Sequence, residues 1–307
     1  MLTASDGVRE LAVLGSPIAH SKSPDLHGAA YRALGLPWSY GRAEVASDEL
    51  AGFVRGRSDA WRGLSLTMPL KQSVLPLVAT LDETARLTGA ANTILFDADE
   101  HGERVLRGFN TDVAGIVRAL TAAGTGAARY VLIWGGGATA ASALVAAAEL
   151  GADEAMVQVR EPARAEHLVS LGASAGLRVL IARFDDPVAR RPDLVVSTLP
   201  GHAGADGTAE LLVRSPALEQ AAAEGILLFD VAYDPWPTRI VSEWSTTARA
   251  ANRAPNALSG LAMLVQQALL QVRIFVTGDP ERELPDEARV LAAMLEAVGL
   301  DASGRPV

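Results

Sequence analysis

The sequence contains no cysteine, and this absence excludes three kinds of chemistry. A chain without thiols forms no disulfide bonds, offers no thiolate to a metal ion and has no sulfur nucleophile. Any catalysis must therefore use other side chains.

Positive charge is also scarce. Lysine and arginine number 27 against 36 aspartates and glutamates, the formal net charge is -9, and no basic run is longer than two residues. A broad phosphate-binding face for nucleic acid needs the opposite balance. The composition therefore predicts a small-molecule substrate and no nucleic-acid partner.

Long apolar runs are missing as well. The longest, within residues 140–148 and 261–270, are too short or too interrupted by polar residues to cross a bilayer. The first six residues lack the basic-then-apolar order of a signal peptide. We expect no membrane partner and a cytoplasmic location.

The sequence does contain two series of alternating elements. Its 307 residues, 49% of them hydrophobic and 21% charged, are typical of a globular protein with two domains. Strand-like and helix-like segments alternate over residues 10–66 and again over 130–231, and the pattern turns helical over 258–276 and 285–298. This order predicts an α/β fold with a mostly parallel second sheet, and C-terminal helices that complete the first domain.

A glycine-rich turn follows the predicted strand 130–134 and opens a predicted helix. Its residues are Gly135, Gly136, Gly137 and Ala138. Glycines allow a tight turn and let backbone N–H groups and the helix N-terminus reach a pyrophosphate. The turn indicates a dinucleotide site, although a tight βα turn without a ligand has the same pattern.

The end of the next predicted strand bears on the choice of dinucleotide. In such folds an acid at this position binds the ribose 2′-hydroxyl, whereas an arginine accommodates a 2′-phosphate. Arg160 and Arg164 favour NADP, while Glu161 between them favours NAD.

Two serines precede the first predicted helix. Pro24 is typical of a first helical position, so we expect Ser23 to cap the helix and Ser21 to project just before it. Paired hydroxyls of this kind bind a carboxylate or a polyol, or only stabilise the turn. We interpret the neighbouring His20 as a loop residue outside the site.

Residues 65–71, Ser-Leu-Thr-Met-Pro-Leu-Lys, place two hydroxyls and a lysine at the end of an apolar run. Lys71 is a candidate for proton transfer or carbonyl polarisation, although an isolated lysine is usually a solvated charge. Asp112 opens the predicted helix 113–123, where an acid is either a helix-terminus residue or a partner for the lysine.

In order along the chain, these segments resemble the shikimate dehydrogenase family. The similar elements are Ser21 to Pro24, Ser65 to Lys71, Ala91 to Thr93, Asn110 to Gly115, Gly135 to Ala140, Ser197 to Pro200, Asp230 to Thr238 and Gly260 to Ala268. Eight ordered elements are far more specific than any one of them.

The resemblance implies NADPH-dependent reduction of 3-dehydroshikimate to shikimate, and the reverse oxidation, without a metal. It implies that Lys71 and Asp112 are the catalytic pair. It gives as substrate-binding residues Ser21, Ser23, Thr67, Asn92, Asp112, Tyr233 and Gln267. It gives as cofactor-binding residues Gly135, Gly136, Gly137, Ala138, Arg160, Arg164, Thr198, Val231, Gly260 and Met263.

Three positions depart from the family pattern. Ser65 stands where the family usually has asparagine, so a longer hydrogen-bonding arm is missing. Ala138 replaces a glycine in the phosphate turn. Glu161 replaces a threonine after the retained Arg160, so NAD stays an alternative to NADP.

The expected organisation is a discontinuous substrate domain, residues 1–112 and 250–307, and a Rossmann-like NADP domain over 113–249. Quinate and aminoshikimate are alternative substrates, and a non-catalytic ligand-binding paralogue is an alternative function. A methylenetetrahydrofolate dehydrogenase is disfavoured by the serine loop and Gln267. A monomer and a homodimer are both compatible with the sequence.

Overall fold

A computed structural model describes residues 7–188, 190–201, 212 and 215–307. The chain forms two compact units. Unit 1 comprises Met1–Gly115, Leu264–Ala302 and Pro306–Val307, and unit 2 comprises Ile116–Met263 and Ser303–Arg305. Helices α5 (Asp112–Ala122) and α11 (Gly260–Thr277) each contribute residues to both units.

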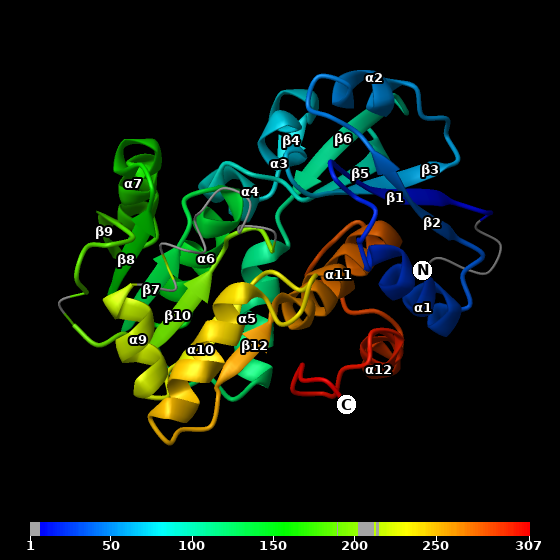
Figure 1. Cartoon of the computed structure of the whole chain (residues 1–307). Coiled ribbons are helices and arrows are strands. Elements are labelled where there is room, and N and C mark those ends of the chain that lie inside the picture. The colour runs from blue at the N-terminus through cyan, green and yellow to red at the C-terminus, as the bar shows by residue number, and fades with distance from the viewer. Residues whose placement is uncertain (1–6, 189, 202–211, 213–214) are drawn as a thin grey trace. The chain divides into compact units, whose positions relative to one another are not determined.

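Unit 1 is built on a mixed six-stranded sheet (Figure 1). Its order is β2 (Ser39–Glu44), β1 (Glu10–Gly15), β3 (Trp61–Leu66), β5 (Thr93–Ala98), β6 (Arg104–Phe109) and β4 (Thr80–Leu81). Strands β2, β1 and β3 are parallel, whereas β5 runs antiparallel to both β3 and β6. The beginning of β5 therefore lies at the same edge as the ends of β3 and β6.

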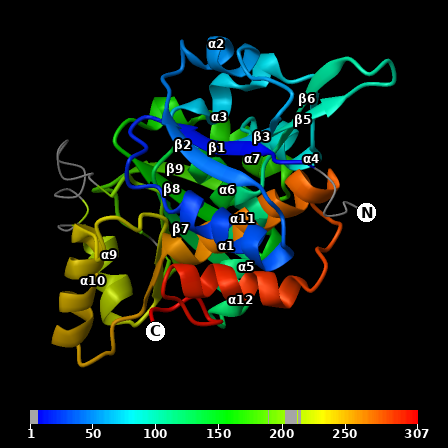
Figure 2. The ribbon, with the colours of Figure 1, turned by 90° about the vertical axis from the view of Figure 1, so that its right-hand side faces the viewer.

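The helices of unit 1 are mostly short. They are α1 (Ser23–Leu34), α2 (Leu50–Arg55), α3 (Leu70–Ser73), α4 (Glu83–Thr88) and α12 (Glu287–Ala297), with a 3₁₀ turn at Leu75–Leu77. Helix α12 packs against α1 (Figure 2). Apolar side chains of the sheet, such as Leu14, Leu64 and Ile94, form one buried cluster with Leu70 of α3. This packing fixes α3, which carries Lys71.

Unit 2 contains a parallel six-stranded sheet. Its order is β12 (Ala257–Ser259), β11 (Leu227–Asp230), β10 (Leu194–Ser197), β7 (Tyr130–Trp134), β8 (Glu154–Val159) and β9 (Arg178–Arg183). Its helices are α6 (Ala138–Glu149), α7 (His167–Ser174), α9 (Pro216–Ala223) and α10 (Arg239–Ala250), with a 3₁₀ turn at Pro162–Ala165. Trp134 of β7 and Trp244 of α10 lie edge to face in the core, their ring centroids 6.3 Å apart. The predicted α/β fold class is confirmed.

Some local expectations differ from the structure. Residues 250–263 were expected in the first domain, but β12 pairs with β11, and this pairing moves the boundary to Met263. The antiparallel β5 was not anticipated. Ser23 is not the cap of α1, because the helix already includes it and the Ser21 hydroxyl accepts the Ser23 N–H at 3.3 Å.

Helix α11 has 18 residues and is, by length and composition, long and apolar enough to cross a bilayer. It is longer than the apolar run noted in the sequence at 261–270. However, 78% of it is buried inside the protein. Such burial is typical of a helix in the core of a folded unit.

Asp230 is a buried carboxyl group at the end of β11. Burial raises its pKa to about 6, although it accepts hydrogen bonds from the Thr238 hydroxyl at 2.6 Å and from the backbone N–H of Ala232. Thr238 in turn caps α10 by accepting the N–H of Val241. By accepting these hydrogen bonds, the Asp230 carboxyl group fastens the loop between β11 and α10.

We expect Asp230→Asn to flatten the pH dependence of stability. The folded-state pKa exceeds the unfolded value of 3.8, so the native protein binds more protons and loses stability as pH rises toward and past 6. The contribution of Asp230 to the free energy of unfolding should fall by about 2 kcal/mol between roughly pH 4.5 and 7.5. Urea unfolding of both proteins at the two pH values measures this change. A constant difference between them would contradict it.

Candidate active site

The Nζ atom of Lys71 lies 2.5 Å from Oδ2 of Asp112, with 14% and 5% of the two side chains exposed. Lys71 belongs to α3 after β3, and Asp112 is the first residue of α5 after β6. Because β5 pairs with both of these strands, their ends meet at one edge of the sheet. The structure brings together the two residues predicted as a catalytic pair.

Asn92 holds the carboxylate of this pair. Its Nδ2 donates to Oδ1 of Asp112 at 2.8 Å and also contacts Thr111 Oγ1 and Gln267 Oε1. The Thr111 backbone N–H donates to Asn92 Oδ1 at 3.0 Å, which fixes the orientation of the amide. Asn92 and Gln267, both predicted to contact substrate, therefore lie beside Asp112.

Close backbone approach makes the position of Gln267 possible. A Cβ atom at Gly115 of α5 would lie 2.7 Å from the Cβ of Gln267 on α11. Only a glycine fits at that distance, so Gly115 lets the two helices bring Asp112 and Gln267 together.

The remaining predicted substrate residues of unit 1 lie around the start of α1 and after β3. Ser21 is buried in the turn before α1, and Ser23 is buried at the first position of that helix. The Thr67 backbone N–H donates to Leu14 O at 2.9 Å, which ties the end of β3 to β1. A Cβ atom at Gly15 would lie 2.4 Å from Thr67 Cγ2, so this glycine makes room for the threonine.

Tyr40, Ser65 and Gln271 form a polar cluster that was not anticipated. The Tyr40 hydroxyl donates to Ser65 Oγ at 2.6 Å, and Ser65 donates to Gln271 Oε1 at 2.8 Å. Ser65 has a shorter side chain than the asparagine usual in the family. In the structure the side-chain amide of Gln271, on α11, accepts the hydrogen bond of Ser65. Gln271 follows Gln267 by one helical turn, and this i, i+4 spacing was the signal in the sequence.

Tyr40 is held by stacking on His27, with the two ring centroids 3.9 Å apart. Burial lowers the pKa of His27 to about 4, so the ring is neutral near pH 7. Its Nδ1 lies 3.0 Å from Ser23 O and must donate, since a carbonyl oxygen only accepts. Burial also raises the pKa of Tyr40, so its hydroxyl stays a donor.

The chain has two lysines, Lys22 and Lys71, and its other side chains that are cationic at pH 7 are arginines. Lys22 lies between the two loop serines, and Lys71 pairs with Asp112. Lysine releases a proton readily, whereas arginine does not. The use of lysine at position 71 is therefore consistent with proton transfer.

In unit 2 the glycine turn fits a phosphate group. Gly135 has a φ of 110°, and a Cβ atom there would meet Thr198 Oγ1 at 2.4 Å. A Cβ at Gly137 would meet nothing within 4 Å, and no side chain caps α6, which begins at Ala138. The first N–H groups of the helix are therefore available to an anion.

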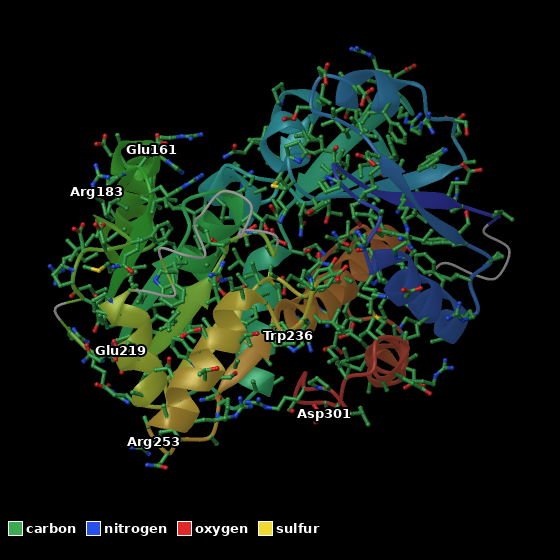
Figure 3. All side chains as sticks on the ribbon, viewed as in Figure 1. Glu161, Arg183, Glu219, Trp236, Arg253 and Asp301 are labelled. Atoms are coloured by element: carbon green, nitrogen blue, oxygen red, sulfur yellow. The ribbon has the colours of Figure 1, made fainter. Side chains whose placement is uncertain are left out.

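Arg160, Glu161 and Arg164 follow β8, and Arg183 lies beside them on β9. Val159 pairs with Arg183 in the sheet, and Arg183 Nη1 donates to Arg160 O at 3.4 Å. The labels of Glu161 and Arg183 in Figure 3 mark this end of the sheet. Three arginines and one glutamate therefore occupy the position where such folds bind the adenosine ribose.

Other predicted cofactor residues also lie in unit 2. A Cβ atom at Gly260 would lie 1.8 Å from Val231 O, so these two residues are in close backbone contact. Thr198 donates through Oγ1 to Trp134 O at 2.9 Å, and Met263 is buried. Tyr233, predicted to contact substrate, lies in the loop after β11. Over the residues that the structure describes, no three His, Asp or Glu side chains are grouped to hold a metal ion.

Comparisons with known proteins give a consistent result. Residues 13–94 match a family model described as the shikimate dehydrogenase substrate binding domain. The chain is 33% identical over 296 residues to a shikimate dehydrogenase (NADP(+)) of Geobacter metallireducens, covering 93% of this chain and 97% of the relative.

Solved structures agree with this similarity. A shikimate dehydrogenase of Mycobacterium tuberculosis is 38% identical with a TM-score of 0.73, covering 94% of this chain and 99% of that one. A shikimate 5-dehydrogenase of Thermus thermophilus, solved with NADP(H) and shikimate, is 31% identical with a TM-score of 0.72 and the same coverage.

Proposed function

Since the chain belongs to the shikimate dehydrogenase family, we propose that it reduces 3-dehydroshikimate to shikimate with NADPH and catalyses the reverse oxidation. The observation that carries this proposal is the Lys71–Asp112 pair, which Asn92 holds through Asp112 Oδ1. A protein that only binds ligands has little need for a lysine so placed.

In the reduction, Lys71 is the proton donor. When bound, NADPH supplies a hydride to the carbonyl carbon of the substrate, and the carbonyl oxygen becomes an alkoxide that needs a proton. Lys71 gives this oxygen one proton from Nζ and is left as a neutral amine that solvent reprotonates. Asp112 holds the amine and accepts a hydrogen bond from the adjacent substrate hydroxyl.

Unit 1 carries the groups that bind the substrate. Hydroxyl and amide groups suit a ring that bears hydroxyls and a carboxylate, because each can donate and accept. The residues of unit 1 proposed to hold it are Ser21, Ser23, Thr67, Asn92 and Gln267.

Unit 2 carries the groups that bind the dinucleotide. The backbone N–H groups of residues 135–138 would hold the pyrophosphate. Arg160 and Arg164 would hold the 2′-phosphate, which supports NADP as the preferred cofactor over NAD. The residues proposed to lie near the nicotinamide are Thr198, Val231, Gly260 and Met263.

A direct assay tests this function. Purified protein is incubated with shikimate and either NADP or NAD, and the absorbance of the reduced nicotinamide is followed. We expect turnover that is faster with NADP at equal low concentration, because only NADP offers a 2′-phosphate to Arg160 and Arg164. Parallel assays with quinate and aminoshikimate decide which hydroxy acid is preferred. Absence of turnover with every combination would refute the enzymatic proposal.

A further inference from the structure

We propose that Gln271 is a further positioning residue, which holds Asn92 and through it the Lys71–Asp112 pair. This inference rests on the proposed function for its meaning in catalysis. Its basis is an unbroken series of hydrogen bonds from Tyr40 to Asp112, in which Gln271 is the central residue.

One end of the series fixes the Gln271 side chain. Tyr40 donates to Ser65 Oγ at 2.6 Å, and Ser65 donates to Gln271 Oε1 at 2.8 Å. Each hydroxyl has a single hydrogen, so both hydrogens are committed. Gln271 is only 1% exposed, so water does not compete for its amide.

The other end of the series reaches Asn92 by two routes. Gln271 Nε2 donates to the backbone carbonyl of Asn92 at 3.2 Å and to Thr93 Oγ1 at 2.9 Å. Thr93 then donates to Asn92 Oδ1 at 2.8 Å. Both oxygen atoms of Asn92 are therefore held, directly or indirectly, by one glutamine.

Asn92 transmits this restraint to the reacting groups. Its Nδ2 donates to Asp112 Oδ1 at 2.8 Å, while Lys71 donates to Oδ2 at 2.5 Å. A small error in the orientation of Asp112 would therefore move the amine that must deliver a proton. Catalysis is sensitive to displacements of this kind even when their source is remote from the substrate.

The donor and acceptor count explains why a glutamine is needed. The side chain accepts from Ser65 and donates to Thr93 and to the Asn92 carbonyl, which requires an acceptor and two N–H groups in one planar group. A methionine fills similar volume but offers neither N–H group, so Thr93 and the Asn92 carbonyl lose a buried donor.

We expect Gln271→Met to lower kcat about tenfold, with KM for shikimate changed less than threefold. The matched control is Gln266→Met on the same helix, because Gln266 is also buried but is not part of the series. The control should stay within twofold of wild type in kcat. A Gln271→Met protein with unchanged kcat, or with its loss confined to KM, would overturn the proposal.

A double-mutant cycle separates positioning from general damage to the fold. If Gln271 acts through Asn92, adding Gln271→Met to Asn92→Ala should lower kcat by less than twofold further. An equal tenfold loss in both backgrounds would show that the two act independently. Should Gln271→Met fail to fold, Thr93→Val removes one hydroxyl of the series without changing shape, and should lower kcat severalfold.

A second measurement does not depend on turnover. Acetylation by acetic anhydride, followed by peptide mass spectrometry, compares Lys71 with Lys22 as the internal reference. In the Gln271→Met protein, acetic anhydride should acetylate Lys71 at least threefold faster relative to Lys22. A misplaced Asp112 pairs with the Lys71 amine for less of the time, so the amine is more often free to react. Wild-type protein without turnover would refute the proposed function alone. An unchanged labelling ratio would refute the positioning role.

Discussion

Replacing Lys71 with methionine should lower kcat about a thousandfold, while the dissociation constant for shikimate rises less than tenfold. General acid–base groups typically contribute 10²–10⁴-fold, and methionine keeps the aliphatic length of lysine but carries no proton. Stopped assays of turnover and calorimetric titration of shikimate measure the two quantities separately. A kcat within tenfold of wild type would contradict the proton-transfer role.

The Lys71→Arg variant tells proton transfer from charge alone. Arginine retains a cation beside Asp112, yet it does not release a proton in the accessible pH range. We therefore expect Lys71→Arg to lose at least a hundredfold in kcat, close to the methionine variant. Recovery of most of the activity by arginine would show instead that the positive charge polarises the carbonyl.

The second large effect concerns stability and lies between α11 and α12. Arg273, with 5% of its side chain exposed, donates from Nε and Nη2 to the Glu287 carboxylate at 2.6 and 2.5 Å, and from Nη1 to Pro280 O at 3.0 Å. Glu287→Leu leaves this guanidinium buried without its anion. Removing one partner of a buried pair costs about 3–5 kcal/mol, so we expect a loss of that size in the free energy of unfolding.

Urea unfolding measures this loss, and a neighbouring residue provides the control. Glu283 lies 3.8 Å from Arg273 but is 80% exposed, so Glu283→Ala should change the stability by less than about 0.5 kcal/mol. The double variant Arg273→Leu with Glu287→Leu should recover much of the loss, because no charge then stays buried. Equal effects of the two single variants would contradict a buried pair.

The sequence predicted those parts of the fold in which the hydrophobic pattern is strong and local. Strand β7 has the expected bounds, 130–134, because it is a compact apolar run before a turn. The short β12 was not recognised, since three residues carry no periodicity and their strand character depends on pairing with β11. Strand β5 was missed because its antiparallel direction follows from pairing with β3 and β6, not from its own residues.

The same distinction applies to the site. Family membership was recognised from ordered motifs and is confirmed by the comparisons. Lys71 and Asp112 were nominated from those motifs, and the structure places them in contact. Gln271 was not nominated, because its partners Ser65 and Thr93 lie more than 170 residues away and only the register of β3 and β5 brings them to α11.

The near absence of lysine has a practical consequence for handling this protein. Its only side-chain amines, Lys22 between Ser21 and Ser23 and Lys71 beside Asp112, both belong to unit 1. Amine-reactive dyes, cross-linkers and activated supports will therefore attach, apart from the chain's N-terminus, beside the groups that we propose to bind substrate.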